Sequence, residues 1–210
     1  MNDPLENRLR KAADALRAPD FDGAGFAERA SEEGLADVAY TYADSPLGRL
    51  LLAATPRGLA CISYLDFRPE DDVLAWIAER LSPRVVEAPA QLDAVRGQLD
   101  DYFGGRRRSF DLPLDWGLAR DFGRRVLGQT ARIPFGEVAT YGEVAAAIGS
   151  PGGARATGNA LGRNPMPIVV PCHRVVRGGG KMGGYTGGVE RKELLLTLER
   201  EGRADGERLW

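Results

Sequence analysis

The chain has 210 residues, of which 43% are hydrophobic and 28% are charged, and its formal net charge is −2. That length can bury one sizeable core or two modest ones. No run approaches the ~20 apolar residues that a membrane-spanning helix needs, and residues 1–20 lack the apolar segment of a secretion signal. We therefore expect a cytoplasmic protein that does not enter a membrane.

The first 38 residues are an amino-terminal extension whose role the sequence does not indicate. Leu5, Leu9 and Leu16 have the spacing of one face of an amphipathic helix over residues 4–17. Residues 20–34 are glycine-rich and acidic. The extension is compatible with an ordered addition, a helix that docks on a partner, or a loose arm.

Residues 39–116 predict a small α/β unit that ends in a linker. Two apolar segments, Arg49–Thr55 and Gly58–Tyr64, flank a Pro/Gly turn and predict a β-hairpin. Apolar residues at helical spacing predict helices over Asp71–Leu81 and Ala90–Phe103. The segment Arg106–Trp116 has a basic run, a proline and little periodicity, which indicates the linker.

Residues 117–210 predict a helical unit. Helices are expected over Asp121–Ala131, Tyr141–Ile148, Ala154–Leu161 and Glu190–Arg200. The second and third are separated by a glycine-rich turn, which is typical of a helix-turn-helix. The third carries small side chains and no array of groups that could distinguish base edges, so it is suited to close approach without sequence readout.

Charge is unevenly distributed along the chain. Residues 1–118 carry 14 Lys/Arg against 21 Asp/Glu, whereas residues 119–192 carry 11 against 4. A basic segment on an otherwise acidic protein indicates a site for a polyanion, although a solvated basic face would look the same.

The segment Pro171-Cys172-His173-Arg174-Val175 places one of the two cysteines beside the only histidine. A thiol becomes a good nucleophile when a neighbouring imidazole or positive charge lowers its pKa from about 8.5. Adjacency in sequence alone leaves open a buried cysteine followed by an unrelated histidine. Cys61 lies in an apolar run and is expected in the core as a small hydrophobic residue.

The residues around this motif carry a resemblance to a known family. The segment from Thr140 to Glu199, which contains TYGEVAAAIG, GNALGRNP, VVPCHRVV and GGYTGG, is similar to the O6-alkylguanine-DNA alkyltransferases. The segment YADSPLGRLLLAATPRGLACISY resembles the amino-terminal domain of the bacterial members. The resemblance covers about residues 39–202. It implies an α+β fold, with an amino-terminal ribonuclease H-like α/β domain and a carboxy-terminal helical domain that carries the helix-turn-helix and a reactive-cysteine loop.

The family's activity is the irreversible, stoichiometric transfer of the O6-alkyl group of guanine, and by implication the O4-alkyl group of thymine, from double-stranded DNA to Cys172. The target base must leave the helix stack for this reaction. Arg155 matches the family's intercalating arginine, and Tyr141 matches the tyrosine that crowds the extruded nucleotide and can protonate guanine N3. A phosphate contact for Arg155 and a core position for Tyr141 are the alternatives. The family lays the helix that contains Arg155 in the minor groove, and the resemblance assigns Ala154, Gly158, Arg163 and Asn164 to DNA binding as well.

The resemblance also assigns the reacting groups. His173 acts through a water molecule as the base for Cys172, and Glu199 holds the opposite imidazole nitrogen. Glu201 is the competing acid, but Glu199 keeps the family's spacing from Lys192. Asn164 ties the DNA-binding helix to the reactive loop, where a simple helix stop is the alternative.

The remaining expectations concern the pocket and the partners. The pocket is assigned to Pro167, Val175, Tyr185, Thr186, Gly187 and Lys192, with Gly187 leaving room for a bulky ring. No cofactor is expected, and one histidine with one spare cysteine is too few for the structural zinc site of some relatives. We expect a monomer in solution and leave cooperative binding on DNA open. Two alternatives stand: a non-catalytic alkyltransferase-like protein, disfavoured by the presence of Cys172, and a helix-turn-helix regulator, which would need a second DNA-reading domain.

Overall fold

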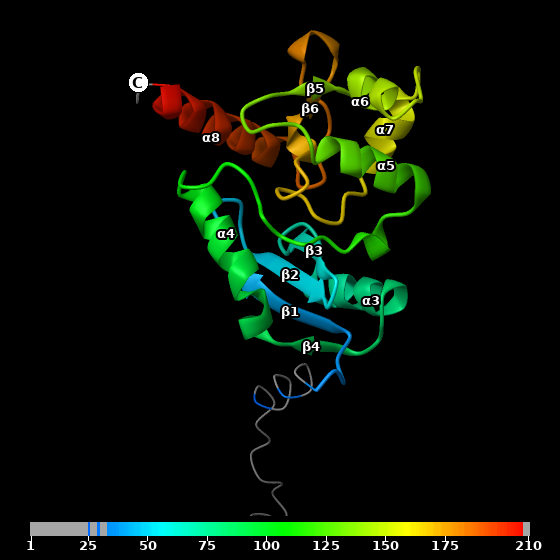
Figure 1. Ribbon diagram of the computed structural model, residues 1–210, viewed down its shortest axis with the longest axis vertical. Coiled ribbons are helices and arrows are strands. Elements are labelled where there is room, and N and C mark those ends of the chain that lie inside the picture. Colours follow the sequence, from blue (N-terminus) through cyan, green and yellow to red (C-terminus); the bar gives the residue numbers. More distant parts are fainter. Residues whose placement is uncertain (1–24, 26–28, 30–32, 208–210) are drawn as a thin grey trace, which may run out of the picture.

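A computed structural model describes residue 25, residue 29 and residues 33–207 of the chain, and Figure 1 shows their arrangement. The helix expected over residues 4–17 lies outside these residues. No helix within the described part is both long enough and apolar enough to cross a lipid bilayer.

The amino-terminal half is built on a four-stranded sheet in the order β3-β2-β1-β4. Strands β2 (Leu50–Thr55) and β3 (Gly58–Tyr64) form the predicted antiparallel hairpin. Strands β1 (Val38–Ala43) and β4 (Val85–Glu87), which the sequence analysis did not predict, pair with each other in parallel, and β1 also pairs with β2.

Helices cover this sheet where apolar periodicity predicted them. Helix α3 (Glu70–Arg80) buries Val73 and Ile77, and helix α4 (Asp93–Phe103) buries Val95, Leu99 and Tyr102. A short 3-10 turn, η1 (Pro89–Leu92), precedes α4 and accounts for the earlier start that the sequence suggested.

The carboxy-terminal half contains the predicted helices α5 (Asp121–Thr130), α6 (Tyr141–Ala147) and α7 (Ala154–Leu161). Thr140 and Glu143 form a capping box that fixes the start of α6. The turn between α6 and α7 contains Gly149 and Gly152, whose φ angles of 72° and 85° require glycine. The final helix α8 (Val189–Glu207) extends beyond the segment predicted for it.

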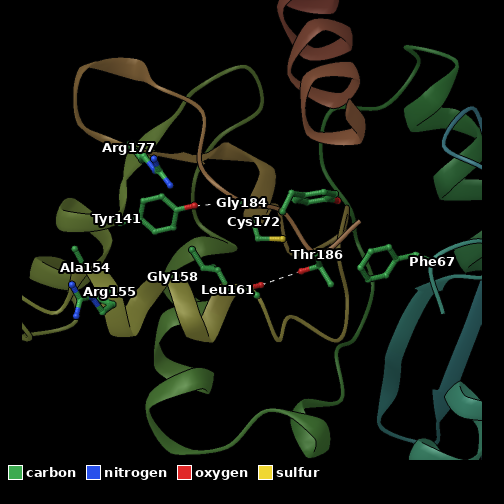
Figure 2. Close-up of a pocket in the computed structure, with 12 residues that line it drawn as sticks. Phe67, Tyr141, Ala154, Arg155, Gly158, Leu161, Cys172, Arg177, Gly184 and Thr186 are labelled. Atoms are coloured by element: carbon green, nitrogen blue, oxygen red, sulfur yellow. Dashed lines mark hydrogen bonds between the residues drawn. The ribbon is translucent and has the colours of Figure 1, made fainter. Parts of the chain in front are cut away.

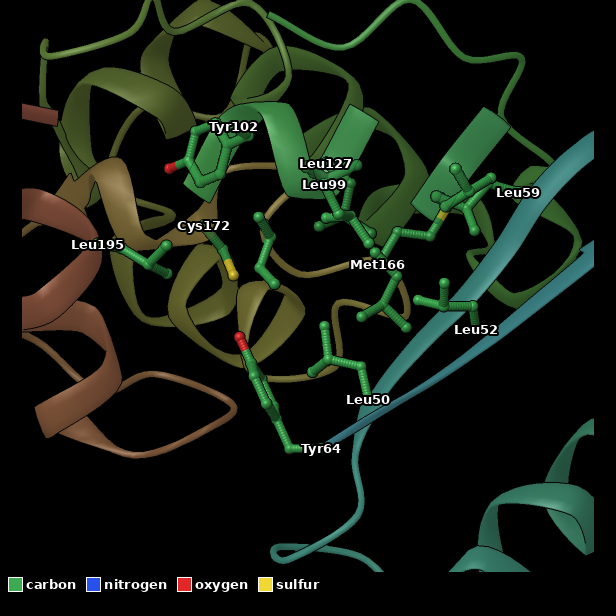
Figure 3. Packing of buried hydrophobic residues seen from close by; sticks show 14 of the residues in the cluster. Leu50, Leu52, Leu59, Tyr64, Leu99, Tyr102, Leu127, Met166, Cys172 and Leu195 are labelled. Atoms are coloured by element: carbon green, nitrogen blue, oxygen red, sulfur yellow. The ribbon is translucent and has the colours of Figure 1, made fainter. Parts of the chain in front are cut away.

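The two halves share one hydrophobic core. A single cluster of buried residues joins Leu50, Leu52 and Leu99 of the sheet half to Leu127 and Cys172 of the helical half (Figure 3). The reactive loop also contains a 3-10 turn, η3 (Cys172–Arg174), and runs into β6 (Val175–Val176), which pairs in parallel with β5 (Ala139–Thr140). The loop is therefore held from both halves of the molecule.

The segment predicted as a linker is anchored rather than loose. Leu59 and Leu114 form an isolated parallel bridge, and η2 (Trp116–Leu118) closes the segment. Asp115 is 3% exposed, and its carboxylate accepts hydrogen bonds from Thr55 Oγ1 at 2.6 Å, from the Arg57 guanidinium and from the Gly117 amide. Burial opposes ionisation of Asp115, but these donors outweigh it and lower its pKa.

We predict that Asp115→Asn lowers the free energy of unfolding by about 1–3 kcal/mol, because it removes charge-assisted hydrogen bonds at a buried site. Since the pKa of Asp115 is lower in the folded state, its contribution is present above the unfolded value of about 3.9 and is lost as pH falls through the folded value. Urea unfolding at several pH values measures the difference. Asp111→Asn, an exposed site in the same segment, is the control. Equal unfolding midpoints for the two variants near neutral pH would contradict the anchor.

Candidate active site

The reactive loop is tied to the end of α7 by Asn164. The Asn164 side-chain amide donates to the Val170 carbonyl at 2.8 Å and to Cys172 Sγ at 3.1 Å, while its oxygen accepts from the Met166 amide at 3.0 Å. Ile168 adopts a left-handed φ of 75°, an uncommon conformation for a β-branched residue, inside this tied segment. The expected connection between Asn164 and the loop is therefore present as three hydrogen bonds.

Glu199 is the centre of a buried hydrogen-bond network. Its carboxylate is fully buried on α8 and lies 2.8 Å from His173 Nε2. Arg174 donates to it from Nε and from a terminal nitrogen at 2.8–3.1 Å. The Tyr102 hydroxyl donates at 2.7 Å and the Gly136 amide at 3.0 Å. Glu201, the competing acid, is exposed, so the structure brings Glu199 and not Glu201 to the histidine.

Burial, against the opposing effect of Glu199, sets the charge state of His173. Burial opposes the ionisation of Glu199, but its hydrogen bonds to His173 and Arg174 outweigh burial and lower its pKa to about 2. Burial lowers the pKa of His173, so its imidazole is neutral at physiological pH. A neutral imidazole that donates from Nε2 to an ionised carboxylate carries its lone pair on Nδ1. That Nδ1 atom is buried and has no hydrogen-bond partner among the residues that the structure describes.

Cys172 is a buried thiol and not a thiolate. The side chain is 4% exposed, and burial raises its pKa to about 11 despite the opposing effects of Asn164 and Lys192. The adjacent histidine predicts a lowered pKa for Cys172, and this prediction is wrong because the imidazole is neutral and desolvation dominates. Reaction at this sulfur therefore requires the thiol proton to be removed.

Lys192 lies behind the thiol, on α8. Its ammonium group donates to the Val175 carbonyl at 2.5 Å, and burial lowers its pKa. Its positive charge favours the thiolate of Cys172, which matters only once the proton leaves.

The thiol faces a cavity of about 590 Å³ between α6, α7 and the loop that precedes α8 (Figure 2). Tyr141 and Gly158 lie on one side, and Arg155 stands at its exposed edge. The lining residues from the predicted set are Tyr141, Ala154, Arg155, Gly158, Cys172, Tyr185 and Thr186.

The Tyr141 side chain packs closely against Gly183 at the cavity wall. A Cβ atom on Gly183 would lie 2.2 Å from the Tyr141 hydroxyl, so only glycine permits this approach. Tyr141 donates weakly to the Gly184 carbonyl at 3.4 Å, and burial raises its pKa, so it carries its proton at neutral pH.

Eight residues of the predicted set do not line this cavity: the contacts of Asn164, His173, Lys192 and Glu199 are given above, and the other four lie elsewhere. Pro167 and Val175 are buried in the protein interior, and the Val175 carbonyl is already held by Lys192. Gly187 faces the Tyr64 ring, which an added Cβ would meet at 2.6 Å. A large side chain at Gly187 would therefore collide with Tyr64 before it narrowed the cavity, and the expectation of open space there is wrong. Arg163 lines a separate cavity beside α5 and Arg120.

Several residues of the site were missed by sequence reasoning. Arg174 was part of the quoted motif, but nothing local shows that its guanidinium turns inward. Tyr64 and Tyr102 come from the sheet half: the Tyr64 hydroxyl bonds to that of Tyr185 at 2.8 Å, and it points toward Cys172 in Figure 3. Phe67 and Arg177 line the cavity from opposite loops. No periodicity connects such distant positions to the reactive loop.

Comparisons with known proteins agree with this architecture. The family model described as "6-O-methylguanine DNA methyltransferase, DNA binding domain" matches residues 121–201, and the model for the ribonuclease-like domain of the same family matches residues 38–116.

Individual relatives align over most of their length. A methylated-DNA–protein-cysteine methyltransferase from Mycolicibacterium paratuberculosis is 42% identical over 163 residues, which is 78% of this chain and 93% of the relative. The constitutive enzyme of that name from Bacillus subtilis is 38% identical, with 77% and 94% covered. The crystal structure of Mycobacterium tuberculosis OGT in complex with DNA superposes with a TM-score of 0.67 at 39% identity, covering 78% of this chain and 94% of that one.

We predict that Cys172 behaves as a high-pKa thiol in the free protein. Its alkylation by iodoacetamide should accelerate continuously up to about pH 9, because the thiolate fraction keeps rising below a pKa of about 11. The rate is measured by mass spectrometry in a Cys61→Ala background, so that only alkylation of Cys172 contributes to the signal. A rate that levels off below about pH 7.5 would indicate a preformed thiolate.

Proposed function

Since the chain belongs to the 6-O-methylguanine DNA methyltransferase family, we propose that it repairs DNA by moving the alkyl group of O6-alkylguanine onto Cys172. The observation that carries the proposal is the placement of the Cys172 thiol at a cavity beside α7, with His173 and Glu199 buried behind it. The proposed nucleophile and its proton acceptor therefore lie beside a cavity that opens next to the proposed DNA-binding helix.

The transfer step is a substitution at the alkyl carbon. Cys172 Sγ forms a bond to that carbon while the bond from carbon to guanine O6 breaks. The thiol proton passes, through a water molecule, to Nδ1 of His173, and the resulting imidazolium is stabilised by ionised Glu199. Because the free thiol keeps its proton, we infer that deprotonation accompanies binding of the lesion and attack.

The departing guanine has to be neutralised. Tyr141 carries a proton at the cavity wall and is the proposed donor to guanine N3. The proton held by His173 then returns, through water, to the Tyr141 phenolate, so that both residues end in their starting protonation states. Backbone groups of Tyr185, Thr186 and Cys172 are the proposed partners of the guanine edge. Val175, which we expected among them, is less suitable because its carbonyl accepts from Lys192.

Extrusion of the base is the proposed task of α7. The small residues Gly158 and Ala154 would let the helix approach DNA closely, and Arg155, which lines the cavity, is the proposed residue that fills the gap left by the extruded nucleotide. Arg163, in the turn after the helix, is the proposed contact to a phosphate. Such contacts with the backbone do not read sequence, which suits a protein that must find lesions anywhere.

The reaction is proposed to occur once per molecule. The product is a thioether, and the second cysteine, Cys61, packs in a different hydrophobic cluster from Cys172. Among the alternatives, a non-catalytic lesion-binding relative is disfavoured by the presence of the thiol. A regulator that uses its helix-turn-helix to read sequence is disfavoured by the small side chains of α7.

The setting of the reaction is also a proposal. The partner is double-stranded DNA that carries O6-alkylguanine, or O4-alkylthymine, met by a monomer in the cytoplasm. The division into an extension (1–38), an amino-terminal domain with linker (39–116) and a transfer domain (117–210) is kept as a prediction, since one core joins the last two.

Intact-mass analysis tests the proposal directly. After incubation with an excess of duplex containing O6-methylguanine, the protein should gain one methyl group, on Cys172, and then stop. Cys172→Ala should remain unmodified while still binding DNA, and Cys61→Ala should react as the unsubstituted protein does. More than one turnover per molecule, or methylation of Cys61, would refute the proposed reaction.

The role of Arg155 is tested by comparing substrates. Arg155→Ala should slow repair of a duplex lesion by at least about 10-fold, because a few kcal/mol of unstacking cost is no longer offset. Transfer from free O6-benzylguanine, which needs no extrusion, should change little. Arg163→Ala, in the turn that follows α7, is the control: it should weaken duplex binding without this contrast between substrates. Equal losses on both substrates for Arg155→Ala would exclude it as the extruding residue.

A further inference from the structure

Tyr102 connects the sheet half of the molecule to the proposed catalytic network. It lies on α4, is fully buried, and is 97 positions from Glu199 along the chain. Its hydroxyl donates a 2.7 Å hydrogen bond to Oε1 of Glu199. This is the same oxygen that lies 2.8 Å from His173 Nε2. One carboxylate oxygen is therefore shared between a tyrosine of the amino-terminal half and the histidine of the reactive loop.

Packing alone accounts for the Tyr102 ring but not for its hydroxyl. The ring contacts Phe103, Phe110 and Phe135 at centroid distances of 5.1–6.1 Å, and a phenylalanine would make the same contacts. A buried hydroxyl requires a hydrogen-bond partner and adds nothing to apolar packing. The hydroxyl stays protonated, because burial and the adjacent Glu199 raise the pKa of Tyr102 far above neutrality.

A permanent donor constrains what Glu199 can do. Tyr102 and Arg174 both donate to its carboxylate, so Glu199 is held as an acceptor and its basicity is reduced. His173 can then meet Glu199 only as a donor from Nε2. That arrangement leaves the Nδ1 lone pair free and keeps the transferred proton on the imidazole rather than on the carboxylate.

We propose that Tyr102 is a positioning residue for alkyl transfer, through which the amino-terminal half sets the tautomer and proton affinity of His173 by way of Glu199. The inference rests on the proposed function, since it names a further residue of the same site. It assigns the sheet half a chemical role in addition to its structural one.

The direction of the expected pH effect follows from the groups around Glu199. These are His173 and Arg174 from η3, Tyr102 from α4, and the uncharged Gly136 amide; Lys192 on α8 acts on His173 at longer range. Removal of the Tyr102 donor makes the carboxylate a better proton acceptor and a stronger partner for the imidazolium. The pKa values of Glu199 and His173 both rise, so the acid-side loss of activity moves to higher pH whichever group sets it.

The test is the pH dependence of single-turnover methyl transfer in Tyr102→Phe. We expect the acid-side midpoint to move up by about one pH unit, the shift that corresponds to loss of one hydrogen bond to a charged group. Tyr42→Phe is the matched control. It removes a tyrosine-to-glutamate hydrogen bond of the same domain, the 2.5 Å contact with Glu70 on α3, and should leave the midpoint in place.

A second substitution gives the opposite sign with almost no steric change. A genetically encoded 3,5-difluorotyrosine at position 102 is a stronger donor, and it should move the midpoint to lower pH. This variant keeps the test decisive if Tyr102→Phe does not fold.

The inference is overturned if the midpoint stays in place in every folded variant, or if Tyr102→Phe lowers the rate by the same factor at all pH values. That second result would mean that Tyr102 supports only the fold. The failure of the proposed function is a separate result, since the unsubstituted protein would then transfer no methyl group to Cys172 at any pH.

Discussion

The site depends on one buried carboxylate. Glu199 would be expensive to bury alone, and its charge is balanced by Arg174 and satisfied by donors from three other parts of the chain. These partners bring α4, the segment before β5, and η3 to a single point on α8. The network therefore determines both where the reactive loop lies and which nitrogen of His173 is occupied by the carboxylate. Loss of the carboxylate would leave Arg174 as a buried, unpaired charge.

The protonated state of Cys172 has a functional advantage. A buried thiol with a pKa of about 11 is protected from oxidants and from adventitious alkylation, both of which require the thiolate. A protein that is consumed by one reaction gains from holding its nucleophile inactive until the correct substrate fills the cavity. Asn164 and Lys192 favour the thiolate, and His173 is the proposed acceptor of its proton, but in the free protein the thiol stays protonated.

Local patterns in the sequence predicted the helices and strands better than they predicted the long-range contacts. Apolar periodicity located α3, α5, α6 and α7 within one residue or so, because each buries one face. Strand β4 was missed because its three residues are too few for alternation to be visible. The family resemblance around Cys172 correctly predicted that Glu199 contacts His173 and that Asn164 contacts the loop of Cys172. Tyr102 and Tyr64 carry no local signal of their role, and the position of Gly187 against Tyr64 depends on how the two halves pack.

The chain contains a single histidine, which allows the central claim to be measured without assignment ambiguity. Nitrogen-15 NMR of the free protein reports the tautomer and charge of His173 from its two ring nitrogens. The account predicts a neutral imidazole at pH 7 with the proton on Nε2 and a bare lone pair on Nδ1. A proton on Nδ1, or an imidazolium at neutral pH, would contradict it, because His173 could not then accept the proton of Cys172.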